Sequence, residues 1–206
     1  MPLMIIGLGN PIGMYPGHER HNMGFMVTDM MAGNHGLTFR PAPSDILALT
    51  TSLDNGKGEN VLLVQPQTTM NRSGEAIEAI ANLLGWNRNT NDTAYADFVL
   101  VQDDVELEPG RIRIKRGGSD GHHNGVKSVM DSLGKDADRL VKVKVGVGRP
   151  PKGTSMFDWV TGEMEDSALN SLMPGVAMAT AAIEDYVQNR NVEAIMNKYN
   201  GMSKHH

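Results

Sequence analysis

The sequence contains no cysteine and no long hydrophobic run. Without cysteine, the chain has no disulfide, thiolate zinc site or cysteine nucleophile. No apolar stretch approaches the roughly 20 residues that a membrane-spanning helix needs. The N-terminus shows neither a basic segment before an apolar one nor an Arg/Ser-rich presequence. We therefore expect a cytoplasmic protein that makes no membrane contact.

The sequence also lacks an excess of positive charge. It has 19 Lys and Arg residues against 24 Asp and Glu residues, a formal net charge of −5. Strong nucleic-acid binders are usually basic. If this chain binds RNA, we expect a local basic patch and a modest, salt-sensitive affinity.

The hydrophobic pattern predicts alternating strands and helices. Strands are expected at residues 3–8, 46–53, 60–65, 98–102, 111–116 and 141–145, and helices at residues 24–33, 73–84, 126–133, 166–189 and 191–199. This alternation favours a single α/β domain, with a mixed, mainly parallel sheet covered by helices on both faces. We assign residues 1–200 to it and residues 201–206 to a tail, disordered or left from a tag.

Several local features refine this prediction. Asn55-Gly56 indicates a hairpin turn, and Ser73 is the expected N-cap of its helix. Pro174 is expected to kink or split the helix that contains it. Residues 87–93 are predicted to form a linker and residues 150–161 a loop.

The last two strands alternate apolar and basic residues, which indicates that each is half-exposed. Arg111, Arg113 and Lys115 share one face of the first, and Lys142 and Lys144 share one face of the second. Such faces are usually only solvated. A sharper hypothesis is a positive platform for the phosphates of a nucleic acid.

Polar side chains collect in four loops at or near strand ends, where open α/β sheets form their sites. They are Asn10, Tyr15, His18, Arg20, His21 and Asn22; Thr68, Thr69, Met70 and Asn71; Asp103 and Asp104; and Ser119, Asp120, His122, His123 and Asn124. A histidine can take a proton from water, and a carboxylate behind it fixes its tautomer. Carboxamides can stabilise an oxyanion. This set suffices for metal-free ester hydrolysis, although each residue alone is more often structural.

Three other motifs compete with this hypothesis. Gly7-Leu8-Gly9 resembles part of a dinucleotide fingerprint, but Pro11 interrupts it and the third glycine is displaced. Residues 117–121 match the G-x-S-x-G elbow, but no helix begins directly after the serine. His122 and His123 with Asp103 and Asp104 could bind a metal, yet adjacent histidines on an extended segment point to opposite faces. Metal-dependent hydrolysis stays as the minor enzyme hypothesis.

Taken in order, these segments resemble the bacterial-type peptidyl-tRNA hydrolase family. The resemblance rests on Ile6-Gly7-Leu8-Gly9-Asn10-Pro11 with Tyr15 and Arg20-His21-Asn22-x-Gly24, on Pro66-x-x-x-Met70-Asn71-x-Ser73-Gly74, on Asp103-x-x-x-Leu107-x-Pro109-Gly110, on Gly121-x-His123-Asn124-Gly125-x-Lys127-Ser128, and on Val145-Gly146-Val147-Gly148-Arg149-Pro150. It spans roughly residues 4–200. Five collinear motifs are far more specific than one.

The resemblance implies a role for each position. His21 would be the general base that activates water, held by Asp103, and Asn10 would sense whether the substrate's α-amino group is blocked. The residues expected to bind substrate or to support those that do are Tyr15, Thr69, Met70, Asn71, His123 and Asn124, with Lys115, Lys144 and Lys142 on tRNA phosphates. Thr69 departs from the family, which usually has an aromatic residue there. Residues 150–161 would form part of a mobile rim.

The expected activity is cleavage of the ester bond in N-blocked aminoacyl-tRNA and peptidyl-tRNA, which recycles tRNA after premature release from the ribosome. The resemblance implies no cofactor and no metal, and we expect a monomer. A catalytically silent RNA-binding protein on the same fold remains the alternative from a different class. A metal-dependent hydrolase of small esters or peptides is a third.

Overall fold

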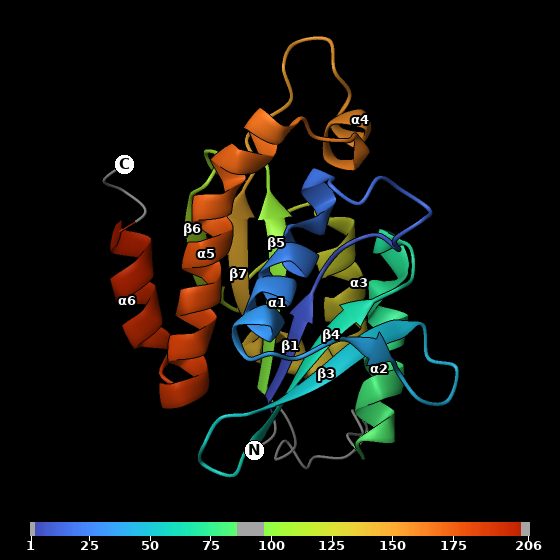
Figure 1. Ribbon diagram of the computed structural model, residues 1–206, viewed down its shortest axis with the longest axis vertical. Coiled ribbons are helices and arrows are strands. Elements are labelled where there is room, and N and C mark those ends of the chain that lie inside the picture. The colour runs from blue at the N-terminus through green and yellow to red at the C-terminus, as the bar shows by residue number, and fades with distance from the viewer. Residues whose placement is uncertain (1–2, 86–96, 203–206) are drawn as a thin grey trace.

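The computed structural model describes residues 3–85 and 97–202, and they form one α/β domain around a seven-stranded sheet (Figure 1). The strands are β1 (Leu3–Gly7), β2 (Arg40–Pro41), β3 (Ala48–Asp54), β4 (Asn60–Pro66), β5 (Asp97–Asp104), β6 (Ile112–Arg116) and β7 (Val141–Gly146). Their order across the sheet is β2-β3-β4-β1-β5-β7-β6.

The centre of this sheet is parallel and its edges are antiparallel. Strands β4, β1, β5 and β7 run in one direction. Strands β3 and β4 are antiparallel and are joined by the hairpin expected from Asn55-Gly56. Strand β6 is antiparallel to β7. The mixed sheet confirms the predicted fold class, and the carboxyl ends of β1, β4, β5 and β7 lie along one edge.

Helices cover both faces of the sheet, as predicted (Figure 1). The α-helices are α1 (Met23–Asn34), α2 (Ser73–Leu83), α3 (Asn124–Leu133), α4 (Met156–Thr161), α5 (Asp166–Asn189) and α6 (Val192–Met202); 3-10 turns are η1 (Arg20–Asn22), η2 (Met70–Arg72) and η3 (Gly134–Arg139). One core cluster joins α1, α5 and α6 to the sheet. The other joins α2 and α3 to the opposite face.

The residues of β1 show how the sequence produces this arrangement. Successive side chains of a strand point to opposite faces. Leu3 and Ile5 enter the cluster under α1, while Met4 and Ile6 enter the cluster under α2 and α3. Because both faces are covered, the strand needs an unbroken apolar run rather than an alternating one.

Two glycines let α1 start directly beside the ends of β1 and β5. A Cβ atom on Gly24 would lie within 2.5 Å of the carbonyl oxygens of Leu8 and Val101. A Cβ on Gly7 would collide with the backbone of Gly24 in turn. This close approach fixes the position of η1, which carries His21 just before the helix.

Three local predictions were wrong. Helix α2 has Arg72, not Ser73, at its N-cap, and no side chain caps it. Ser73 is the first residue of the helix, and its hydroxyl donates to the carbonyl of Met70. Residues 150–161 are not all loop, since α4 begins after Ser155, whose hydroxyl accepts from the backbone N–H of Asp158. That Ser-x-x-Asp spacing is a capping signal that the sequence does contain.

The third error concerns β7, which was expected to be half-exposed. The strand lies between β5 and β6, so neighbours cover it, and Lys142 is only 2% exposed.

Helix α5 is continuous through Pro174, so the proline does not split it. The predicted linker at residues 87–93 lies outside the described residues.

The chain ends are only partly described. Helix α6 continues through Met202, so residues 201 and 202 belong to the helix rather than to the expected tail. Residues 203–206 lie outside the described part. Within residues 3–85 and 97–202, no helix combines the length and apolar character that crossing a bilayer requires.

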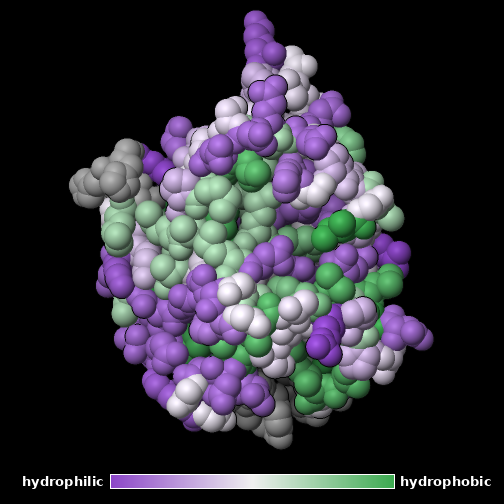
Figure 2. All heavy atoms as spheres, in the orientation of Figure 1, coloured by the Kyte–Doolittle hydropathy of each residue, from purple (hydrophilic) through white to green (hydrophobic). Residues whose placement is uncertain are grey.

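The edge formed by the carboxyl ends of the strands carries the α4 segment above it (Figure 1). In Figure 2 the loop that projects above the sheet, ahead of α4, is mainly hydrophilic, while weakly hydrophobic atoms lie over α5 lower on the same face. The polar loops after β1, β4 and β5 open toward this edge.

Candidate active site

His21 and Asp103 form the centre of the site. Asp103 is the seventh residue of β5, close to the strand's carboxyl end, and its carboxylate is buried. The Nδ1 atom of His21 lies 2.9 Å from Asp103 Oδ1. The His21 side chain is 17% exposed, so its ring joins the buried carboxylate to the open side of the site.

His123 shares the same carboxylate oxygen. Its Nε2 atom lies 2.9 Å from Asp103 Oδ1, and its ring centroid lies 5.1 Å from that of His21. Its Nδ1 atom accepts from the backbone N–H groups of Gly125 and Val126 at the start of α3. An Nδ1 that accepts leaves the proton on Nε2, so His123 donates to Asp103 as a neutral imidazole.

The same logic sets the tautomer of His21. A carboxylate can only accept, so His21 donates from Nδ1, and its Nε2 keeps the lone pair that a general base needs. In the described part of the chain, no hydrogen bond engages that Nε2.

The electrostatics support an ionised Asp103. Burial alone would raise its pKa, but His21 and His123 outweigh burial and hold the pKa of the carboxyl below its usual range. For His21, burial alone would lower the pKa, while Asp103 and, to a smaller extent, Glu19 raise it above the ordinary value of 6.5. This arrangement is the one expected for a base supported by a charged partner.

Asn10 connects the first loop to the second. Its side-chain Oδ1 accepts from the backbone N–H of Met70 at 3.2 Å, and its Nδ2 donates to Glu19 Oε1 at 2.6 Å. Its own backbone N–H donates to Asn22 Oδ1 at 2.7 Å. The carboxamide is 3% exposed and is held in one orientation.

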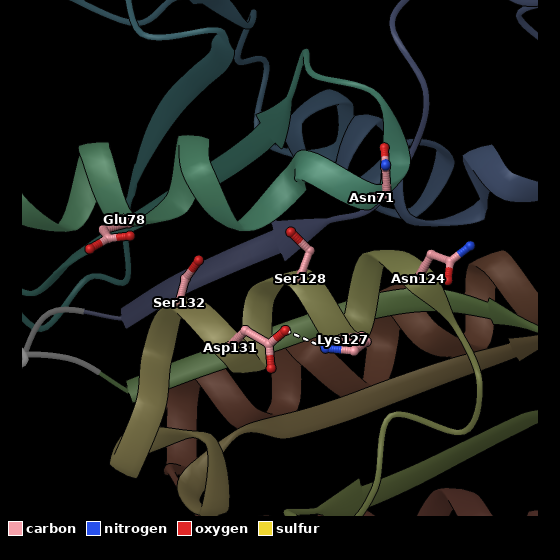
Figure 3. Close-up of a pocket in the computed structure, with 7 residues that line it drawn as sticks. All are labelled: Asn71, Glu78, Asn124, Lys127, Ser128, Asp131 and Ser132. Carbon is pink, nitrogen blue, oxygen red and sulfur yellow. Dashed lines mark hydrogen bonds and ion pairs between the residues drawn. The ribbon is translucent and has the colours of Figure 1, made fainter.

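Asn71 and Asn124 lie at the same end of a groove between α2 and α3 (Figure 3). The groove encloses about 430 Å³ and is lined by Asn71, Glu78, Asn124, Lys127, Ser128, Asp131 and Ser132. The helices meet closely there, because a Cβ on Gly74 would collide with the Ser128 carbonyl. Both residues are exposed, Asn71 in the middle of η2 and Asn124 at the start of α3.

The other predicted lining residues take different positions. Met70 is buried and packs against Gly125 of α3, so it joins the second loop to the fourth. Thr69 is half-buried and donates from its hydroxyl to Asn71 Oδ1 at 2.9 Å. Tyr15 is half-buried in the first loop and is not among the groups hydrogen-bonded to His21 or Asp103.

The predicted basic residues lie on one face of the sheet. Lys115 pairs with Lys142, and Arg113 pairs with Lys144, across β6 and β7. Their apolar neighbours enter the core under α5, so these side chains point to the face that carries α3. Lys115 and Arg113 are exposed, and Lys144 makes an ion pair of 2.8 Å with Asp104.

Lys142 differs from the other three. Its ammonium donates to the carbonyls of Gly118 and Ser119, both at 2.8 Å. It therefore holds the segment that returns from β6 to His123. The loop has to cross this face because β6 runs antiparallel to β7 and ends at the opposite edge.

His21, Asp103 and His123 are also the group that could hold a metal ion, with ligand atoms within 4.8 Å of one another. The sequence suggested His122 and Asp104 beside His123 and Asp103, but His122 is exposed and Asp104 pairs with Lys144. To ligate through Nε2, His123 would have to move its proton to Nδ1, where two backbone N–H groups already donate. The hydrogen bonds thus favour a proton-bearing imidazole over a metal ligand.

Sequence reasoning missed Glu19 and Trp159. Glu19 is fully buried beside Asn10, and burial, its largest influence, raises its pKa to about 7. The guanidinium carbon of Arg20 lies 3.3 Å from the ring centroid of Trp159 in α4. The Nε1 of Trp159 donates to the Gly148 carbonyl. Nothing in their local sequence marks either residue, because both contacts depend on segments brought together by folding.

The comparisons with known proteins agree with this geometry. The sequence model of a family described as peptidyl-tRNA hydrolase matches residues 4–206. A peptidyl-tRNA hydrolase of Moorella thermoacetica is 35% identical, covering 96% of this chain and 97% of the relative. One of Pediococcus pentosaceus is 36% identical, covering 96% and 99%.

Solved structures give the same result. The crystal structure of peptidyl-tRNA hydrolase from Acinetobacter baumannii superposes with a TM-score of 0.80 at 25% identity, covering 96% of this chain and 93% of that one. The sequence match extends over almost the whole chain and includes all four loops of the site. The chain therefore belongs to the peptidyl-tRNA hydrolase family.

Proposed function

We propose that this enzyme hydrolyses the ester bond between a peptide, or an N-blocked amino acid, and the 3′ end of tRNA with water activated by His21. The observation that carries the proposal is the bond from His21 Nδ1 to the buried Asp103, which leaves Nε2 as the base. Family membership supplies the substrate class. The arrangement requires no cofactor and no metal.

The chemistry follows from this geometry. His21 Nε2 takes a proton from water as the water oxygen bonds to the ester carbonyl carbon. Asp103 stabilises the imidazolium that forms. When the tetrahedral intermediate collapses, the carbon–oxygen bond to the ribose breaks and the imidazolium returns a proton to the leaving oxygen. The products are a free carboxyl group on the peptide and a tRNA with its 3′-terminal hydroxyl restored.

The carboxamides would act on the substrate rather than on the water's proton. Asn71 and Asn124 lie at one end of the α2–α3 groove, where their N–H groups can bind the substrate backbone and stabilise the oxyanion (Figure 3). Asn10 would distinguish a blocked α-amino group from a free one. Tyr15, Thr69 and Met70 would line the cleft near the 3′-terminal nucleotide or the peptide, and His123 would support Asp103.

The tRNA would be held mainly through phosphates on the face formed by β6 and β7. Lys115 and Lys144 supply positive charge there, with Arg113 beside them. Lys142 would contribute indirectly, by holding the backbone carbonyls of residues 118 and 119. We further propose a cytoplasmic monomer that recycles tRNA from peptidyl-tRNA released prematurely by the ribosome.

The assay that tests this function measures release of a labelled N-acetylated amino acid from tRNA in the presence of a chelator. Unblocked aminoacyl-tRNA is measured in parallel. We expect rapid cleavage of the blocked substrate alone. Cleavage of neither by the folded protein would favour the silent RNA-binding alternative, and activity lost in chelator and restored by metal would favour the metal-dependent one.

A further inference from the structure

The Glu19 side chain is buried beside the site, and the chemistry described above gives it no role beyond its small effect on the pKa of His21. It is 0% exposed and stands two residues before His21. Its Oε1 accepts from Asn10, while its Oε2 has no hydrogen-bond partner among residues 3–85 and 97–202. A buried polar atom without a partner costs stability. A carboxyl kept at that cost calls for an explanation.

The contacts of Asn10 show what Glu19 does. The Asn10 Nδ2 donates to Glu19 at 2.6 Å, and the Asn10 Oδ1 accepts from the Met70 N–H at 3.2 Å. If the carboxamide turned over, its oxygen would face the Glu19 oxygen and its NH₂ group would face another N–H. Both hydrogen bonds would be lost. Glu19 and Met70 therefore select one of the two orientations of the Asn10 side chain.

The selected orientation determines what the substrate meets. With one N–H and one lone pair already used, the Asn10 carboxamide has one N–H and one lone pair left. An N-blocked residue presents a single, neutral amide N–H, whereas a free aminoacyl group presents an amine or ammonium with several. A carboxamide that turned freely could adapt its hydrogen bonds to either partner. A carboxamide fixed in one orientation cannot adapt in this way, so it can distinguish the two partners better.

We propose that Glu19 is a positioning residue that sets substrate selectivity by holding the Asn10 carboxamide in this orientation. The inference rests on the proposed function, because it assumes that Asn10 faces the substrate's α-amino group. Glu19 touches no reacting atom and affects selectivity only through Asn10. Its charge near His21 acts on the cleavage of both substrates alike and leaves their ratio unchanged.

The test measures kcat/KM for N-acetylated and free aminoacyl-tRNA and compares their ratio among variants. Glu19→Met keeps the length of the side chain but removes the acceptor, so we expect the ratio to fall about tenfold, which corresponds to the loss of one hydrogen bond. Glu19→Gln keeps an acceptor and should stay within about twofold of the wild type. The matched control is Glu163→Met, an exposed glutamate whose backbone bridges to Glu19.

A double-mutant cycle separates positioning from a general structural effect. In an Asn10→Ala background, Glu19→Met should change the ratio no further, because the group it positions is gone. If Glu19→Met does not fold, Glu19→Ala carries the same comparison. An unchanged ratio in the folded variant, or an equal loss with and without Asn10, overturns the inference alone. A wild-type chain that cleaves neither substrate overturns the proposed function and this inference with it.

Discussion

Asp103 is the residue on which the account depends most, because a single oxygen of its carboxylate bonds both His21 and His123. The cap that His123 provides to α3 fixes its tautomer, and this fixes the direction of its bond to Asp103. His21 is thereby left as the one imidazole of the pair whose lone pair has no hydrogen-bond partner among the described residues, since the Nδ1 of His123 accepts from two backbone N–H groups. We therefore expect the two neighbouring histidines to have different roles, base and support.

The raised pKa of His21 predicts a pH dependence. His21 must be neutral to act as a base, so kcat/KM should rise with pH through a midpoint above 6.5. Asp103→Asn removes the largest influence that raises this pKa, so the midpoint should move to lower pH. The plateau value of kcat should fall by roughly 10²- to 10⁴-fold, because the imidazolium loses its partner. A pH–rate profile of both proteins measures each effect.

The control for this comparison is His18→Ala, which removes an exposed imidazole of the same loop and should change neither the midpoint nor the plateau. A midpoint that stays in place in Asp103→Asn would show that the carboxylate does not set the pKa of the base. A raised KM at constant kcat would show that Asp103 acts on binding instead.

The sequence contained enough to predict His21, Asp103, Asn10, Asn71, His123 and Asn124 as site residues, because they stand in collinear motifs with several fixed positions. It did not show which of them bond one another, or that Glu19 joins them. The bonds of Glu19 to Asn10 and of His123 to Asp103 span 9 and 20 residues and depend on how the loops fold back. A buried glutamate with an orphaned oxygen has no local signature, since any polar loop contains carboxylates.

At the scale of elements, the alternation of strands and helices was predictable. The spacing of apolar residues along the sequence reflects which side chains a strand or a helix buries. The exceptions have physical causes. Lys142 made β7 look half-exposed, but its ammonium is satisfied by two carbonyls, so a lysine occupies a buried position. Helix α4 is too short to show a helical period, and only the capping serine at position 155 marks it.

The contact between α1 and the strands gives a prediction at this scale. Gly24→Ala places a methyl group against the Leu8 and Val101 backbone, which cannot move like a flexible side chain, so the free energy of unfolding should fall by roughly 3 kcal/mol. Activity should fall as well, because His21 directly precedes α1. Urea unfolding followed by circular dichroism measures the change.

Gly33→Ala is the matched control, since it lies in the same helix with open space around its Cβ position. It should raise the free energy of unfolding by about 0.5–1 kcal/mol, because alanine restricts the unfolded chain more than glycine does. Equal effects of the two substitutions would contradict the close approach of α1 to β1 and β5.

At the scale of the whole molecule, the net charge of −5 hides an uneven distribution. Strands β6 and β7 place Arg113, Lys115, Lys142 and Lys144 on one face, although a loop, α3 and η3 separate the first two residues from the others in the sequence. The sequence predicted each pair of charges but not their juxtaposition, which depends on the antiparallel register of the two strands.

This face predicts how tRNA binding depends on salt. Lys115→Ala should weaken binding and reduce the slope of log Kd against log salt by about 1, as expected for one lost phosphate contact. Lys198→Ala, on α6 beneath the opposite face, should leave the slope unchanged. Filter binding of tRNA over a range of salt concentrations gives both slopes, and equal slopes in the two variants would exclude β6 from the tRNA-binding surface.

If His21 is the base, its loss should show first in single-turnover cleavage of N-acetylated aminoacyl-tRNA by His21→Ala. We expect this variant to bind tRNA and unfold like the wild type, while its rate of cleavage falls by at least about 10²-fold. Cleavage by the folded variant at nearly the wild-type rate would contradict the mechanism and require a different base.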